Sequence, residues 1–93
     1  MIADELRGVA TLDDLKRVLL IAARREAPRR LSAIEFDREQ FEAQKRMRDE
    51  HGMDAQAVVQ RFATRHTDIM VHAEAANLVS HPEFVAAVAR LTR

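Results

Sequence analysis

Residues 55–78 read AQAVVQRFATRHTDIMVHAEAANL. Apolar side chains recur in this stretch every three or four residues, which is the spacing of one helix face. The stripe extends from Ala55 to Asn77 and covers about a third of the helix circumference at about 100° per residue. It therefore predicts one helix of roughly 35–40 Å, at 1.5 Å per residue. A second stripe on the opposite side (Val71, Ala75, Leu78) predicts that the end of this helix is covered on two sides.

The residues before this stretch predict a tight joint between two helices. Gly52 follows a highly charged segment, and Asp54 stands immediately before the stripe. Glycine is typical of helix ends because it adopts the left-handed conformation without strain, and aspartate caps the free amides of the next helix. We therefore expect residues 32–79 to form a long helical hairpin.

Three other helix starts have the spacing of a capping box, in which a hydroxyl and a carboxylate satisfy the first amides of a helix. They are Thr11–Asp14, Ser32–Glu35 and Ser80–Glu83. The helix that follows Thr11 is apolar over much of its circumference, so we expect it to be central or to have two partners. Residues 2–9 predict only a brief helix or an arm. The predicted core consists of Leu15, Leu19, Val58, Phe62, Ile69, Met70, Leu78, Phe84 and Val88.

The composition supports helices and opposes a sheet. Glycine and proline occur twice each, the only aromatic residues are four phenylalanines, and tryptophan and tyrosine are absent. Sheets need turn residues and favour β-branched and aromatic side chains, whereas alanine, leucine, arginine and glutamate favour helices. We therefore predict an all-α fold, an antiparallel helical bundle of four main helices built on the long hairpin. The 93 residues are expected to form a single helical domain, 1–93.

Charge and cysteine content restrict the function classes. The 15 basic and 15 acidic residues cancel, so no long-range field attracts nucleic acid, and the absence of cysteine excludes thiol chemistry. Asp4 and Glu5 stand where a secretory signal would be basic, and the apolar run Val18 to Ala23 is far too short for a membrane span. The cytoplasm is the expected location. The preference for arginine over lysine suggests a bacterial or phage source.

The candidate catalytic and metal-binding residues have simpler structural interpretations. Asp68 and His72 are four residues apart on one face, but a metal site needs three or four convergent ligands. Ser32 and Ser80 are better explained as helix caps, and neither lies in a glycine-flanked nucleophile turn. We therefore expect no enzyme activity, no cofactor and no metal.

A basic stretch from Lys16 to Arg30 leaves three interpretations open. Its six basic residues and one acid give a net charge of +5. The stretch could contact the phosphates of nucleic acid, rest on a membrane surface, or be a solvated helix end that pairs with the acidic helix expected after Ser32 or with the same helix of a second subunit. The overall neutrality of the chain favours the third interpretation.

The apolar faces of the predicted helices indicate protein binding. The stripe after Gly52 is longer than neighbouring helices can easily cover, and residues 32–51 carry two narrow apolar faces among dense charge. We expect a non-enzymatic interaction module, such as an adaptor, inhibitor, chaperone or immunity-type protein, whose partner is another protein or a second copy of itself in a homodimer. The expected partner-binding residues are Ile34, Phe36, Phe41, Met47, Val59, His66 and Met70.

DNA binding is the alternative. Gly52, Met53, Asp54 and Val58 are spaced as in the middle of a helix-turn-helix DNA reader, which this segment resembles. In that case the groove-facing residues would be Gln56, Gln60, Arg61 and Arg65, since glutamine and arginine read base edges. The segment departs from the pattern in two ways. Arg48 occupies a position that is usually small, and both predicted helices are longer than those of such readers.

Overall fold

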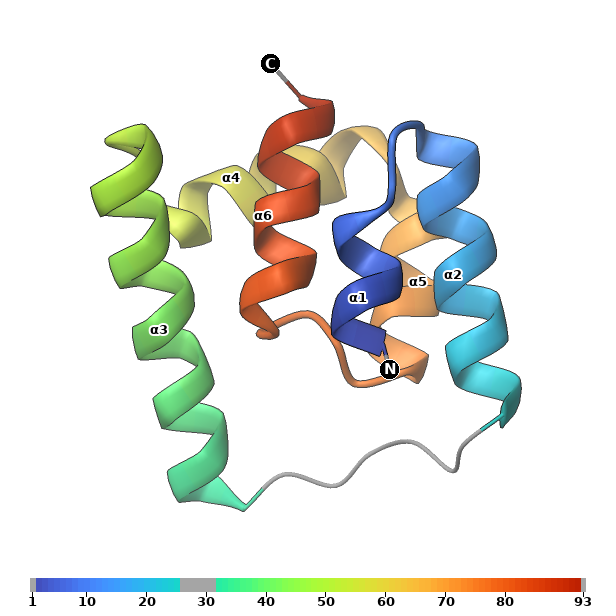
Figure 1. The fold of residues 1–93 in the computed structure, drawn as a ribbon, viewed down its shortest axis with the longest axis horizontal. Helices are drawn as coiled ribbons and strands as arrows, with labels where there is room; N and C mark the ends of the chain where they lie inside the picture. The colour runs from blue at the N-terminus through green and yellow to red at the C-terminus, as the bar shows by residue number, and fades with distance from the viewer. Residues whose placement is uncertain (1, 26–31, 93) are drawn as a thin grey trace.

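The computed structural model describes residues 2–25 and 32–92, which form six helices and their connections. They are α1 (Ile2–Arg7), α2 (Leu12–Arg25), α3 (Ala33–His51), α4 (Ala55–Arg65), α5 (Thr67–Ala75) and α6 (Pro82–Leu91). The described residues include no strand, so the predicted all-α fold is confirmed. Consecutive helices α1 and α2, and likewise α5 and α6, run antiparallel, whereas α6 runs in the same direction as α1 and α3 (Figure 1).

Helix α6 forms the centre of the structure. It packs against α1, α3 and α4, and it lies between α3 and α1 with α4 behind it (Figure 1). Every residue from Glu83 to Ala89 is buried. Three of these residues are alanines, whose small side chains let the surrounding helices approach closely. The burial of α6 is thus nearly complete around its circumference, as expected for a helix enclosed by several others.

Helix α2 lies at the edge, where it packs against α1 and α5. Of the two arrangements that the sequence allowed for it, the structure has the second, a helix with two partners. Leu15 and Leu19 are fully buried on the side facing these partners, and the other apolar residues of α2 are half-buried.

The predicted core is confirmed. All nine predicted core residues have exposed fractions of 7% or less. The brief opening segment also contributes, because Leu6 of α1 is fully buried. The guanidinium of Arg90 on α6 donates hydrogen bonds to the backbone oxygens of Leu6 (3.0 Å) and Val9 (3.2 Å), which secures the end of α1 with a cation.

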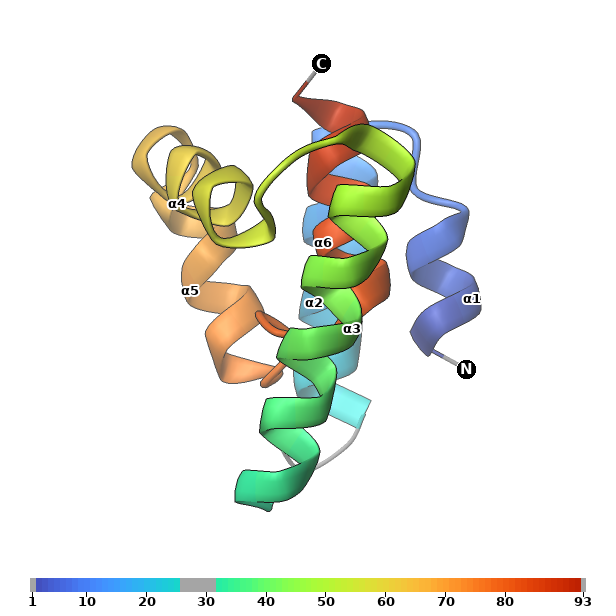
Figure 2. The same ribbon diagram turned by 90° about the vertical axis from the view of Figure 1, so that its left-hand side faces the viewer.

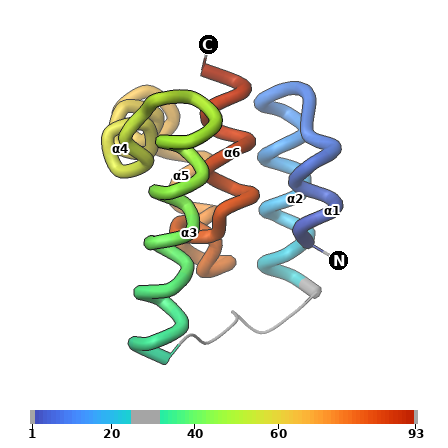
Figure 3. Tube along the Cα trace, turned by 60° about the vertical axis from the view of Figure 1, so that its left-hand side comes forward, coloured from blue at the N-terminus to red at the C-terminus, as the bar shows by residue number. Residues whose placement is uncertain are grey.

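The joint at Gly52 is confirmed. Gly52 is left-handed (φ 62°, ψ 28°), and its N–H donates to the backbone oxygen of Arg48 at 3.0 Å. The side chain of Asp54 accepts hydrogen bonds from the amides of Gln56 (2.9 Å) and Ala57 (3.2 Å). Helix α4 leaves this joint across the direction of α3: Figures 2 and 3 show α4 nearly end-on and α3 from the side.

The predicted single helix over residues 55–79 is wrong. The chain breaks at His66 (φ −133°, ψ 60°), which ends α4 and begins α5. Helix α5 ends at Ala75, and Asn77 adopts a left-handed conformation (φ 55°) two residues later. The second stripe is covered only at Leu78, which is 2% exposed, whereas Val71 is 61% exposed and Ala75 is exposed as well. The predicted hairpin therefore extends only through α3 and α4, and α5 turns away to pack against α2.

At two of the three predicted capping boxes the hydroxyl caps the helix as expected. The hydroxyl of Thr11 accepts from the amide of Asp14 (3.1 Å), and that of Ser32 from the amide of Glu35 (3.2 Å). The third prediction is wrong, because His81 is the N-cap of α6 and its Nδ1 accepts from the amide of Glu83 (3.1 Å). The pattern misled because the side chain of Glu83 points into the interior, where distant residues bind it.

Candidate functional site

The N-terminal half of α3 stands away from the rest of the structure. It extends past the end of α6 in both Figure 1 and Figure 2. No residue from Ala33 to Glu42 is buried, although this segment includes three large apolar side chains. Ile34 is 72% exposed, Phe41 is 69% exposed and Phe36 is 40% exposed. This is the main concentration of exposed large apolar side chains in the described residues.

The outer face of α3 combines two of these apolar residues with basic ones. Ile34, Arg38, Phe41, Lys45 and Arg48 follow one another at alternating intervals of four and three residues, and all five are exposed. At about 100° per residue they lie within about 40° of one line along the helix. We call these five residues the α3 stripe. No ion pair or hydrogen bond of the three basic side chains occurs in the described part of the chain.

A cleft of about 460 Å³ lies on the other side of α3. It is bordered by α3, α4 and the segment that connects α5 to α6. Its lining is Phe36, Gln40, Ala43, Gln44, Asp54, Ala55, Gln56, Val59, Gln60, Asn77, Val79, Ser80 and Val85. The polar groups of this lining are almost all neutral amides. Gln44 uses its Oε1 to accept from the amide of Ala55 at 2.8 Å, so one amide is committed to the start of α4.

The predicted partner-binding residues separate into three groups. Ile34 and Phe41 belong to the α3 stripe, while Phe36 and Val59 line the cleft. Met47 and Met70 are core residues, with exposed fractions of 0% and 7%, so neither is available to a partner of the folded chain.

His66, the remaining predicted residue, is half-buried at the break between α4 and α5. Its ring lies 4.8 Å from that of Phe62. The amphipathic pattern placed it on the same face as core residues, and its ring packs there beside Phe62.

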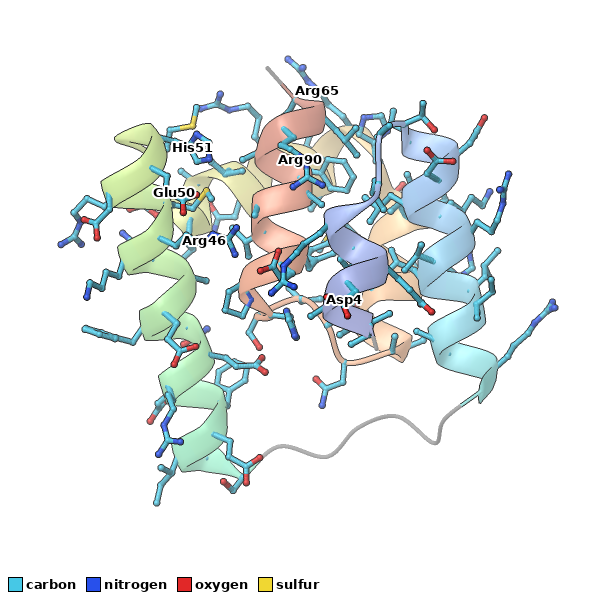
Figure 4. The ribbon with its side chains drawn as sticks, in the orientation of Figure 1. Asp4, Arg46, Glu50, His51, Arg65 and Arg90 are labelled. Atoms are coloured by element: carbon cyan, nitrogen blue, oxygen red, sulfur yellow. The ribbon has the colours of Figure 1, made fainter. Side chains whose placement is uncertain are left out.

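The four residues of the DNA-binding alternative do not form one compact face. All four are exposed. Gln56 and Gln60 line the cleft beside α3, whereas Arg61 and Arg65 lie about 100° and 140° further round α4 than Gln60. Figure 4 shows Arg65 pointing away from the body of the structure. The expected length of the reading helix is corrected, since α4 has 11 residues.

A buried carboxylate stands behind α3. Glu83 of α6 is 6% exposed, and its Oε1 lies 2.6 Å from Nη1 of Arg46 and 3.2 Å from Nε of Arg7. Arg46 also bonds Glu50 on α3 (3.3 Å), and Figure 4 shows its side chain directed from α3 toward α6. Burial acts to raise the pKa of Glu83, but the hydrogen bond and charge of Arg46 and the charge of Arg7 outweigh it and lower that pKa. The same contact with Glu83 raises the pKa of Arg46.

This cluster joins three helices, and its carboxylate Glu83 is buried although the side chain of Arg7 is 58% exposed. Glu83 Oε2 is buried and accepts no hydrogen bond among the described residues. Nearby, Ser80 donates to Oε1 of Glu39 at 2.9 Å, which adds a polar link between α3 and the segment that precedes α6. We interpret both links as structural contacts that hold α3 in place against α6.

The proposed pair of Asp68 and His72 is not formed. Asp68 instead lies 3.6 Å from Nζ of Lys16 on α2. Its pKa is lowered, first by the backbone hydrogen bond at Ile69 and further by the charge of Lys16. Among the described residues no three histidine or acidic side chains are grouped as a metal site would need. No helix in the described ranges has the length and apolar character that crossing a bilayer requires.

The basic stretch from Lys16 to Arg30 is described only in part. Lys16 pairs with Asp68, which lies on α5, so at Lys16 the expected pairing with the acidic helix α3 is not seen. Residues 26–31 lie outside the described residues. They include Pro28, where the sequence predicts an interruption of the helix because proline lacks the amide hydrogen.

Comparison with known proteins gives no relative: no protein-family model, no curated protein and no solved structure matches this chain.

Sequence reasoning missed the basic half of the α3 stripe. It treated residues 32–51 as a segment with two narrow apolar faces among dense charge. The signal was present, because Arg38, Lys45 and Arg48 have helical spacing from Ile34. What the sequence could not show is which side of α3 is covered, and this depends on contacts with α6.

Proposed function

We propose that this protein is a non-enzymatic interaction module that binds another protein through the projecting half of α3. The observation that carries the proposal is the exposure of Ile34 and Phe41, 72% and 69%, on a helix segment with no buried residue. Short helices are marginal without tertiary packing, so a segment of this kind gains stability when a partner covers it.

A partner that covers Ile34 and Phe41 would gain binding free energy from the burial of their side chains. Removing a side chain such as isoleucine or phenylalanine from water contributes about 1.5–3 kcal/mol. Two such residues one heptad apart lie about 10 Å from each other along the helix, at 1.5 Å per residue. They can therefore act as two anchors for one partner, and the basic side chains beside them form a polar rim of the kind found around interface centres.

Selection of binders from a displayed library of random peptides tests this proposal without knowledge of the source organism. We expect most selected peptides to bind the wild-type protein and to lose binding when Ile34→Ser and Phe41→Ser are combined. Val71→Ser is the matched control, since Val71 is 61% exposed but lies on α5. Peptides that depend on Val71, or on none of these residues, would contradict the assignment to α3.

DNA binding through α4 is the second candidate, and the length of α4 favours it. A helix of 11 residues after a glycine joint has the size of a reading helix, although α3 before the joint has 19 residues and Arg48 still occupies a position that is usually small. The separation of Gln56 and Gln60 from Arg65 around the helix weighs against it. A mobility shift on duplex DNA at low salt, abolished by Arg61→Ala with Arg65→Ala, would support this candidate, and no shift at low salt would end it.

A further inference from the structure

We infer that the α3 stripe recognises an acidic amphipathic helix of a partner protein. This inference rests on the proposed function, because it names the chemistry of the partner that α3 would bind. The α3 stripe consists of Ile34, Arg38, Phe41, Lys45 and Arg48, all exposed. Its two apolar members supply the anchors, and its three basic members decide the charge of the occupant.

The charge that the α3 stripe presents depends on which basic side chains of α3 form ion pairs. Arg46, which faces the interior, bonds both Glu83 and Glu50. The three basic side chains of the α3 stripe have no such partner among the described residues. The nearest acids on α3 itself, Asp37 and Asp49, lie about 60° from the centre of the stripe on opposite sides. The stripe is therefore a narrow positive strip on a neutral protein, and acidic side chains at the edges of an occupant would complement it.

The shape of the α3 stripe favours a helix as the occupant. The α3 stripe is a straight ridge that spans about 20 Å from Ile34 to Arg48, at 1.5 Å per residue. A ridge on one helix fits the groove between side-chain rows of another helix. Since the described residues include no strand, they offer no sheet edge to which an extended peptide could add.

A second copy of the chain fits this surface poorly. Antiparallel pairing of two α3 stripes about Phe41 would place Arg38 within one residue of the position opposite Lys45 of the other copy, and parallel pairing would place each basic residue opposite its equivalent. Like charges in such positions repel. The occupant that the charges favour is therefore a different protein.

Nucleic acid and membrane surfaces also attract basic residues, but the composition of the stripe favours protein. Phosphate contacts do not require exposed apolar side chains such as Ile34 and Phe41, and the net charge of the chain is zero. A helix that rests in a membrane surface needs a broad apolar face, whereas this stripe has two apolar residues.

Two designed helical peptides of about 20 residues provide the probes. Both have leucines along one face; one has glutamates beside that face and the other has lysines in the same positions. Binding is measured by titration and located by amide chemical shifts. We expect the acidic peptide to bind the wild-type protein, to shift amides of residues 34–48, and to bind about tenfold more tightly than the basic peptide.

Charge reversal tests whether the α3 stripe is responsible. The variant Arg38→Glu with Lys45→Glu should lose the acidic peptide and gain the basic one. Arg61→Glu with Arg65→Glu is the matched control, because it changes the net charge equally at exposed positions on α4. Equal losses in both variants would reduce the effect to overall charge and overturn the inference.

The remaining outcomes separate the inference from the proposed function. If both peptides bind the stripe equally and Ile34→Ser with Phe41→Ser abolishes both, then α3 binds protein but does not select acids, and only the inference fails. If neither peptide shifts residues 34–48, while random-library binders also ignore Ile34 and Phe41, the proposed function fails with it. Tighter binding of duplex DNA or of phosphatidylserine vesicles than of the acidic peptide at these residues would also overturn the inference.

Discussion

Glu83 is a buried carboxylate whose Oε1 accepts a hydrogen bond from Arg46 and forms an ion pair with Arg7. Glu83→Gln removes the charge while keeping the size of the side chain. We expect the free energy of unfolding to fall by about 1.5–3 kcal/mol, because charge-assisted bonds are lost and Arg46 keeps only the exposed Glu50. Urea denaturation measures the change. Glu50→Gln is the control, and since the side chain of Glu50 is 51% exposed, its effect should stay below about 1 kcal/mol.

The lowered pKa of Glu83 gives stability a defined dependence on pH. The folded pKa is below the ordinary value of 4.5, so the unfolded chain binds the proton more readily. The contribution of Glu83 is therefore fully present above about pH 4.5 and is lost as the pH falls through the folded pKa. The urea midpoint of the wild-type protein should decrease as the pH is lowered below 4.5. The midpoint of Glu83→Gln should decrease less over the same range. Parallel midpoints for the two proteins from pH 6 to pH 3 would contradict this assignment.

The position of Glu83 also shows where local sequence patterns fail. The spacing of Ser80 and Glu83 is that of a capping box, but the strongest interaction of this glutamate is with Arg46, 37 residues away. A local pattern has no information about such a contact. The same holds for Arg46, which is one of several arginines in a charged segment until α6 is placed against α3.

The joint between α3 and α4 depends on one backbone conformation. Gly52 has φ 62°, where a side chain strains the backbone, and a Cβ at this position would meet nothing within 4 Å. We expect Gly52→Ala to lower the free energy of unfolding by about 1–2 kcal/mol through backbone strain alone, and Gly52→Asn to cost less, since asparagine tolerates this region. Thermal denaturation measures both.

Gly8→Ala is the matched control for this prediction. Its added Cβ would make only ordinary contacts, the nearest at 3.6 Å from the backbone oxygen of Glu5, and no left-handed φ is involved. This substitution should leave stability unchanged or raise it by about 0.4–1 kcal/mol, because alanine restricts the unfolded chain. Equal losses at Gly8 and Gly52 would show that strain at the joint is not the cause.

The helices themselves were predictable where caps and glycine mark their ends. Thr11, Ser32, Gly52 and Asp54 each act as their local chemistry predicts. The break at His66 was not predicted, because the apolar spacing continues across it and neither glycine nor proline marks it. A weaker signal was present: Thr67 and Asp68 follow, and such residues favour the first turn of a new helix. Asn77 was a second weak signal, because it occupies the left-handed position after α5 that is usually taken by glycine.

At the scale of the whole molecule, nine core residues were predicted correctly although the central position of α6 was not foreseen. Which residues are buried follows from the apolar pattern of each helix. Which helix is central depends instead on which helix has small residues on several sides. The run from Phe84 to Ala89 satisfies that condition with three buried alanines. The exposed side of α3 follows in turn, because α6 and α4 cover Ala43 and Met47 and leave Ile34 and Phe41 uncovered.

The charge of the α3 stripe leads to a prediction about self-association. The protein without a partner should sediment as a monomer of 10.6 kDa at micromolar concentration and low salt, because pairing two stripes opposes basic side chains. High salt should increase self-association, since screening over about 10 Å at 0.1 M reduces this repulsion.

Neutralising the repulsion is the decisive comparison. A variant with Arg38→Gln, Lys45→Gln and Arg48→Gln keeps Ile34 and Phe41 exposed but removes the three positive charges, so it should associate more strongly than the wild-type protein in sedimentation equilibrium at low salt. Adding Phe41→Ser to the same variant should restore the monomer, because the apolar anchor is then lost. A wild-type dimer that dissociates on charge removal would mean that the basic residues hold two copies together, for example by pairing with acids elsewhere on a second chain. In that case the occupant of α3 would be another copy of this protein rather than a separate acidic partner.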